Sequence, residues 1–183
     1  MDRRQKKTRQ AVYDAFTGLL GRKNYSSITV QEIIDAADIG RSTFYTHYET
    51  KDDLLKSLCE EVFSHVFSTE PEKEKNHDFS HHHGVKARIT HILYHLEEHM
   101  DFMTGILAGD GGELFMNYFK VYLDRLFSPC VQNTSSPVPR DYLLSHMICD
   151  FAETVRWWTK HPDHSPEEIS SFFFETTPVN DCE

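Results

Sequence analysis

Apolar residues recur every three to four positions along most of this 183-residue chain, the spacing that places them on one face of an α-helix. No segment shows the strict alternation expected of a half-buried strand. Periodicity therefore predicts an all-α protein, and the length fits either one ordinary globular domain or a small domain joined to a larger one. The first apolar stripe, which Gly21 ends, comprises Ala11, Val12, Ala15, Phe16, Leu19 and Leu20.

Two short helices are expected next, separated by a break of about three residues. Thr29 and Glu32 form a capping-box pair that starts the first helix. The pattern then breaks at Ile39-Gly40, and a second short helix covers residues 41–48. A helix, a tight turn and a second helix indicate a helix-turn-helix unit, in which the second helix enters the major groove of DNA.

The second short helix has one apolar side. Phe44 and Tyr48 are expected to face a small core together with Ile39, Phe16 and Ile33. The other side chains then point outward, where hydrogen-bond donors with a single formal charge suit both base edges and phosphates. This outward set is Arg41, Ser42, Thr43, Tyr45, Thr46 and His47.

Charge is divided unevenly along the chain. Residues 1–51 hold nine Lys/Arg against six Asp/Glu, whereas residues 52–183 hold ten against twenty-three, within a net charge of −10. Overall acidity argues against coating nucleic acid through bulk positive charge but allows a local basic surface. No window approaches the roughly 20 apolar residues of a spanning helix, and no apolar signal core follows the charged N-terminus. We therefore expect a cytoplasmic protein with no membrane partner.

Residues 28–33 (ITVQEI) and 36–54 (AADIGRSTFYTHYETKDDL) resemble the TetR/AcrR family of transcriptional regulators, and the resemblance extends over residues 8–66. It implies an N-terminal three-helix helix-turn-helix DNA-binding domain in residues 1–50, a connecting helix in residues 51–68, and a C-terminal helical domain for ligand binding and dimerisation in residues 69–183.

This sequence departs from the family pattern at two positions. Asp38 stands where the family usually has a turn glycine, and Gly40 where a small polar helix opener is more usual. We expect both to be tolerated, since aspartate adopts the left-handed backbone better than most residues and glycine is an acceptable N-cap.

The resemblance further implies a homodimeric, sequence-specific transcriptional regulator, which we expect to be a ligand-responsive repressor. Each subunit would place its reading helix in one half-site of a palindromic operator in double-stranded DNA, and an unknown small-molecule effector would alter the half-site spacing. Carried over by position, the side chains facing bases are Arg41, Ser42 and Thr43. The phosphate contacts are Thr29, Gln31, Tyr45, His47 and Lys51, with the Gly40 amide and Thr46 completing the DNA-binding set.

The second half of the chain is rich in aromatic residues at helical spacing. They would suit an apolar effector pocket between helices, although aromatics in this pattern also pack as ordinary core. Two segments, residues 140–160 and 165–176, are the dimer interface that the resemblance implies. The candidate pocket residues are Phe102, Phe115, Tyr118, Phe119, Tyr122, Phe151, Trp157 and Trp158.

Three histidines, His91, His95 and His99, repeat at every fourth position, so adjacent members could share a metal ion. Helical phase places this stripe beside the apolar face, and no carboxylate or cysteine repeats with it. We therefore expect no metal site, and a metal-sensing regulator remains an alternative, as does a non-DNA-binding coregulator of the same fold. The sequence lacks a Gly-rich phosphate loop, a nucleophile elbow and a His-Glu-x-x-His pair, so neither enzyme activity nor a cofactor is expected.

Overall fold

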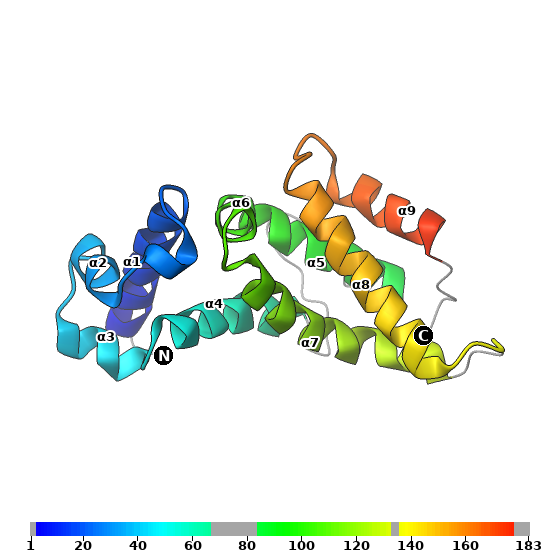
Figure 1. The fold of residues 1–183 in the computed structure, drawn as a ribbon, viewed down its shortest axis with the longest axis horizontal. Helices are drawn as coiled ribbons and strands as arrows, with labels where there is room; N and C mark the ends of the chain where they lie inside the picture. Colours follow the sequence, from blue (N-terminus) through cyan, green and yellow to red (C-terminus); the bar gives the residue numbers. More distant parts are fainter. Residues whose placement is uncertain (1–2, 67–83, 133–135, 178–183) are drawn as a thin grey trace. The chain divides into compact units, whose positions relative to one another are not determined.

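A computed structural model describes residues 3–66, 84–132 and 136–177, and their regular secondary structure is entirely helical, as periodicity predicted (Figure 1). None of these described helices is long and apolar enough to cross a membrane. The elements are α1 (Arg3–Leu20), the 3-10 turn η1 (Tyr25–Ser27), α2 (Val30–Ala36), α3 (Arg41–His47), α4 (Lys51–Val66), α5 (Val85–Glu98), α6 (Met100–Ala108), α7 (Gly112–Gln132), α8 (Arg140–Trp158) and α9 (Pro166–Thr176).

The packing divides into two compact units. Of the described residues, the first unit comprises 3–60 and 101–115, and the second comprises 61–66, 84–100, 116–132 and 136–177. Helices α4 and α7 each run from one unit into the other. The first unit therefore combines the N-terminal helices with α6 and the first turn of α7.

Aromatic burial holds the first unit together. Phe16 from α1 is fully buried, as is Phe44 from α3. Helix α6 contributes Phe102, whose ring centroid lies 6.3 Å from that of Phe16 and 5.8 Å from that of Tyr13. Burying three such rings stabilises the unit by several kcal/mol, at about 1.5–3 kcal/mol for a large apolar side chain.

Sequence reasoning placed α6 and the start of α7 within the C-terminal domain, residues 69–183. In the packing, residues 101–115 lie with the N-terminal helices instead. Gly105 allows this arrangement, because a Cβ atom there would stand only 3.2 Å from the Cβ of Leu20. The backbone of α6 can therefore approach α1 closely. The domain boundaries at residues 50 and 68 stay predictions about function.

The second unit has an aromatic core of its own. Phe119 stacks on Phe63 with ring centroids 5.0 Å apart, and Phe151 meets Phe173 edge to face at 5.1 Å. Helix α5 packs along α9, where the buried Thr90 hydroxyl donates to the Ser170 hydroxyl at 2.9 Å. Figure 1 shows α8 and α9 running side by side. A capping box at Ser165 and Glu168 starts α9.

The Pro/Ser/Asn-rich composition of residues 128–139 predicts a connector throughout. That prediction is partly wrong, because α7 continues to Gln132 with Pro129 inside it. Phe127 and Val131 flank this proline and are buried, so core packing offsets the hydrogen bond that proline cannot donate. The predicted end of the connecting helix, at residue 68, lies outside the described residues.

Substitutions at two glycines test how closely α6 and α7 approach the N-terminal helices, with Gly111 at the close approach and Gly18 as the control. A Cβ atom at Gly111 would lie 2.4 Å from Ile106 Cδ1 and 2.8 Å from Tyr25 Cβ, whereas one at Gly18 meets nothing within 4 Å. We expect Gly111→Ala to lower the free energy of unfolding by about 1–3 kcal/mol through overpacking. Gly18→Ala should raise it by about 0.5–1 kcal/mol. Urea denaturation measures both, and equal effects would contradict the packing described.

Candidate nucleic-acid interface

Helix α2 begins at the capping box that the sequence predicted. The Thr29 hydroxyl accepts from the Glu32 amide at 3.2 Å, and the Glu32 carboxylate accepts from the Thr29 amide at 3.0 Å. Glu32 also pairs with Lys23, and together these partners lower the pKa of the Glu32 carboxyl to about 2. The carboxylate therefore stays ionised and continues to hold the start of α2 at any physiological pH.

The turn between α2 and α3 closes through a left-handed aspartate. Asp38 has φ +50°, so it adopts the conformation that we expected it to tolerate. Its amide donates to the Asp35 carbonyl at 3.3 Å, and the Ile39 amide donates to the Ile34 carbonyl at 3.2 Å. These two bonds form a Schellman motif, which ends α2 and redirects the chain into α3.

Helix α3 presents the outward face that its sequence predicted. Phe44 is fully buried and Tyr48, at its C-cap, is 3% exposed, so these two side chains fix the helix rotation. Tyr45 is 52% exposed, and its ring meets that of Phe44 edge to face at 5.5 Å. None of the six outward residues is buried: Arg41, Ser42, Thr43, Tyr45, Thr46 and His47.

A side-chain network links α2 to the first residue of α3. The Arg41 guanidinium donates to the Gln31 side-chain carbonyl. The Gln31 amide group in turn donates to the Asp35 carboxylate at 2.7 Å. Two residues that were assigned separately to bases and phosphates are therefore held together on one exposed surface. Thr29 lies two residues before Gln31 at the same end of α2.

Lys51, at the start of α4, differs from the other predicted DNA contacts because its ammonium is bonded to backbone carbonyls. Its ammonium donates to the carbonyls of Tyr25 and Ile28, the latter at 2.8 Å, and lies 4.2 Å from the centroid of the Tyr25 ring. Partial burial lowers the pKa of this ammonium. The structure thus gives Lys51 backbone partners in η1, and its phosphate contact stays a prediction.

The predicted effector residues are divided between the two units. Phe102 and Phe115 lie in the first unit, with ring centroids 6.1 Å apart. Phe119, Phe151 and Trp158 are fully buried in the second, where the Trp158 indole donates to the His164 carbonyl at 2.9 Å. Tyr118 and Tyr122 belong to the second unit and are partly exposed. Their role in effector binding stays a prediction.

The histidine stripe lies deeper than its helical phase suggested. His91 and His95 are buried, with their Nε2 atoms 3.1 Å apart, whereas His99 is partly exposed at the C-cap of α5. The expectation that these residues lie beside the apolar face is therefore wrong for the first two. Among the described residues, no three or more His, Cys, Asp or Glu side chains gather in a way that could hold a metal ion.

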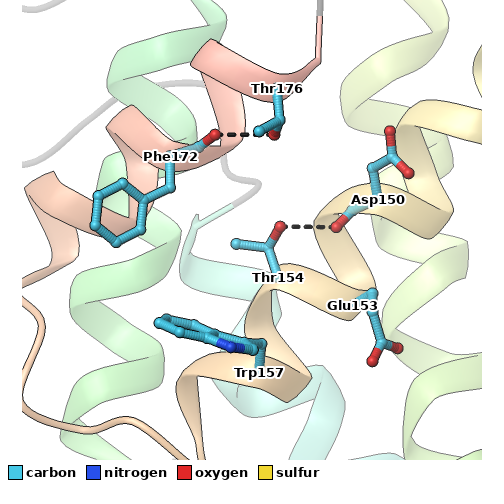
Figure 2. Close-up of a pocket in the computed structure, with 6 residues that line it drawn as sticks. All are labelled: Asp150, Glu153, Thr154, Trp157, Phe172 and Thr176. Carbon is cyan, nitrogen blue, oxygen red and sulfur yellow. Dashed lines mark hydrogen bonds between the residues drawn. The ribbon is translucent and has the colours of Figure 1, made fainter.

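A groove lies between α8 and α9, and of its lining residues only Trp157 is among the pocket candidates predicted from the sequence. It is open, has a volume of about 540 Å³, and places Trp157 and Phe172 edge to face at 6.4 Å (Figure 2). The Thr154 hydroxyl donates to the Asp150 carbonyl at 2.8 Å, and that of Thr176 to the Phe172 carbonyl at 2.9 Å. The available signal was that Trp157 and Phe172 fall outside the apolar stripes of their helices. The lining residues are Asp150, Glu153, Thr154, Trp157, Phe172 and Thr176.

Comparison with known families covers most of the chain. Residues 9–58 match the family described as bacterial regulatory proteins, tetR family, and residues 85–178 match a transcriptional regulator C-terminal region. The chain is 38% identical over 71 residues to the uncharacterized HTH-type regulator YxbF of Bacillus subtilis, covering 36% of this chain and 19% of that protein. It is 24% identical over 124 residues to the dhaKLM operon activator DhaS of Lactococcus lactis, covering 68% and 60%. The matches thus span less than two thirds of these relatives' own lengths.

Solved structures agree with this comparison. A TetR transcriptional regulator from Streptococcus agalactiae is 33% identical, covers 96% of both chains and superposes with a TM-score of 0.72. The structure of DhaS, at 18% identity, 93% of both chains and a TM-score of 0.63, shares the fold. The capped α2, the aspartate turn and the exposed face of α3 define a helix-turn-helix DNA-binding regulator. The chain belongs to the TetR family of bacterial transcriptional regulators.

The left-handed turn residue can be tested directly. Asp38 is exposed and has φ +50°, a conformation that disfavours side chains bearing a Cβ atom. We expect Asp38→Gly to raise the free energy of unfolding by up to about 1 kcal/mol, because removing the Cβ relieves that strain. Asp35→Gly, within regular α2, should lower it by a few tenths of a kcal/mol or more. Chemical denaturation measures both changes, and destabilisation by Asp38→Gly would contradict the assignment.

Proposed function

We propose that this chain is a homodimeric, sequence-specific DNA-binding regulator that acts in the cytoplasm as a ligand-responsive repressor. The observation that carries the proposal is the exposed face of α3, whose rotation is fixed by Phe44 and Tyr48. Arg41 stands at its N-terminal end beside Gln31. A helix that is buried on one side and rich in donors on the other is suited to lie in the major groove of an operator.

The DNA contacts divide by chemistry. Arg41, Ser42 and Thr43 occupy the first turn of α3 and are assigned to base edges, where a guanidinium can bond guanine O6 and N7 together. Phosphate contact is assigned to Tyr45 and His47, together with Thr29, Gln31, Lys51 and the Gly40 amide. The Thr46 hydroxyl donates to the Ser42 carbonyl at 2.8 Å, and while it keeps that bond its oxygen can accept from a DNA donor.

The paired state of Arg41 also matters for recognition. Its guanidinium is held by the Gln31 side chain. Reaching a base edge requires exchanging that partner or keeping it while a second N–H group donates to the base, which a guanidinium with five donors can do. Gln31 would then act in two ways, as a phosphate contact and as a support for the reading arginine.

We assign the dimer interface to the face formed by α8 and α9. Tyr142, Trp157 and Phe172 are large and exposed on this face, at 60%, 40% and 43%. An exposed aromatic surface around a groove is typical of a protein interface. A two-fold axis through it would set the spacing of two reading helices and double the contacts made with a palindromic operator.

The effector is assigned to the aromatic interior of the C-terminal part, with Tyr118 and Tyr122 as the partly exposed members of the predicted set. A small molecule regulates DNA binding only if it prefers the conformation with the wrong half-site spacing, and that difference in affinity limits how far it can relieve repression. The sequence left two alternatives open, a metal-sensing regulator and a non-DNA-binding coregulator of the same fold. No observation among the described residues favours either of them.

The reading residues give the first test. Operator fragments would be selected from the source genome by the purified protein and their affinity measured by fluorescence anisotropy. We expect Arg41→Ala to weaken specific binding by about tenfold or more, since one good base contact is worth about 1–3 kcal/mol in each half-site. Tyr45→Ala removes a proposed phosphate contact, so it should weaken binding to operator and random DNA alike. Melting temperatures should hardly change, because both side chains are exposed.

Two controls sharpen this test. Arg88→Ala removes an exposed arginine from α5 and should leave operator affinity unchanged. Tyr45→Phe keeps the ring and removes only the hydroxyl, so it separates phosphate hydrogen bonding from ring contact. If Arg41→Ala bound the operator as tightly as the parent, the assignment of α3 as the reading helix would be wrong.

The dimer face gives the second test. Trp157→Glu combined with Phe172→Glu places charge beside Asp150 and Glu153, and we expect the dimer to dissociate to monomer at micromolar concentration. Val121→Glu, at a 55% exposed position on α7, is the matched control and should remain dimeric. Sedimentation velocity distinguishes the two species. An intact dimer in the double variant would place the interface elsewhere.

A further inference from the structure

Within the first unit, the turn between α6 and α7 is hydrogen-bonded to η1, which lies 84 positions earlier in the sequence. Asp110 is an exposed residue of this turn, and its two carboxylate oxygens accept from the backbone amide of Ser26 at 3.1 and 3.3 Å. Ser26 lies in η1, between α1 and α2. Hydrogen bonding from Ser26 lowers the pKa of the Asp110 carboxyl, so the acceptor is ionised at neutral pH.

The same turn lies against η1 without room for a methyl group at Gly111, where a Cβ atom would stand 2.8 Å from the Tyr25 side chain. A Cβ atom at Gly109 would make ordinary van der Waals contact with the Asn24 side-chain oxygen, at 3.7 Å. Because interiors packed this closely transmit displacement rather than absorb it, a shift of the turn must move η1. The hydrogen bond and the packing therefore act on the same three-residue segment.

Lys51 connects η1 to the start of α4. Its ammonium donates to the Tyr25 and Ile28 carbonyls and approaches the Ser26 carbonyl at 3.4 Å. The negative charges of Asp52 and Asp110 both stabilise this ammonium. The Tyr25 hydroxyl donates to the Asp52 carboxylate, which closes the connection. Asp110, η1 and the start of α4 thus form one charged cluster, which we call the η1 cluster: Tyr25, Ser26, Ile28, Lys51, Asp52 and Asp110.

The η1 cluster leads directly to the reading surface. Ile28, which Lys51 holds by its carbonyl, precedes Thr29, the N-cap of α2. Two residues further on, Gln31 accepts from Arg41. Each step is a backbone neighbour or a hydrogen bond, so the position of α2 and the orientation of Arg41 depend on where η1 is held.

We propose that the α6–α7 turn sets the position of the reading helices, and that Asp110 is a positioning residue which acts through the Ser26 amide and Lys51. This inference rests on the DNA-binding function proposed above. Helix α7 continues from the turn into the second unit.

The test compares Asp110→Ala with Asp124→Ala in the full chain. Both variants remove one exposed carboxylate, and Asp124 lies on α7 in the second unit. We expect Asp110→Ala to weaken operator binding by about 3- to 30-fold, the range of coupling that such mutations show, while binding to random DNA does not weaken. If Asp110→Ala acted only by removing a negative charge, its affinity for any DNA would rise instead of falling. Asp124→Ala should leave the operator preference unchanged.

Two further measurements separate positioning from a general loss of stability. Amide hydrogen exchange at Ser26 should accelerate in Asp110→Ala, and Asp110→Asn, which keeps an acceptor but loses the charge, should be intermediate in exchange and affinity. Lys51→Met should reduce the operator preference, and its effect should not add to that of Asp110→Ala in a double-mutant cycle. A pure phosphate contact by Lys51 would instead lower the salt slope by about one and add independently.

The outcomes are distinguishable. If the parent protein selects no operator, the proposed function fails and this inference fails with it. If the parent binds an operator and Asp110→Ala binds equally tightly, the positioning role is overturned while the function stands. Unchanged exchange at the Ser26 amide would overturn the role independently of any DNA measurement.

Discussion

The burial of Phe44 and Tyr48 on one side of α3 is the constraint on which the recognition surface depends. A helix of seven residues is too short to be stable in water by itself, because nucleation is unfavourable and few hydrogen bonds follow it. Tertiary burial of these two rings supplies the missing free energy. The 3.6-residue period then forces the six neighbouring side chains outward. Stability and recognition are therefore properties of opposite faces of one helix.

The turn before α3 and the segment before α2 are held by different physical devices. Backbone geometry fixes the first, through the left-handed Asp38 and the two Schellman hydrogen bonds. Charge fixes the segment before α2. The Lys51 ammonium binds the carbonyls of Tyr25 and Ile28, and the Asp110 carboxylate accepts from the Ser26 amide. The first device is local and rigid. The second involves residues far apart in sequence, which makes it the better point for regulation.

This arrangement gives the proposed ligand response a physical form. A regulator of this family needs a connection between its variable effector domain and its DNA-reading helices. Here the close approach of Gly105 and Gly111 brings α6 and the start of α7 into the N-terminal unit. The exposed aromatic face of α8 and α9 belongs to the second unit, where the proposed dimer would form. Reading, signal entry and dimerisation are thus assigned to three separate surfaces of the chain.

Much of the fold and of the DNA-binding surface could be predicted because those signals are local. The capping boxes at Thr29 and Ser165, the turn at Asp38 and the outward face of α3 all depend on residues within a few positions of one another. The effector pocket could not be predicted in the same way. Aromatic periodicity does not distinguish a ring that lines a cavity from one that fills a core, and it could not show that Phe102 packs beside Phe16.

The sequence by itself determined the helical class, the helix starts and the face that α3 exposes, because helical period and capping are set by neighbouring residues. Only the tertiary structure decided that α7 continues through Pro129, that His91 and His95 are buried, and that Asp110 reaches the Ser26 amide. These features depend on contacts between residues far apart in the chain. Such contacts follow from how helices pack, and the pattern within any single helix does not record them.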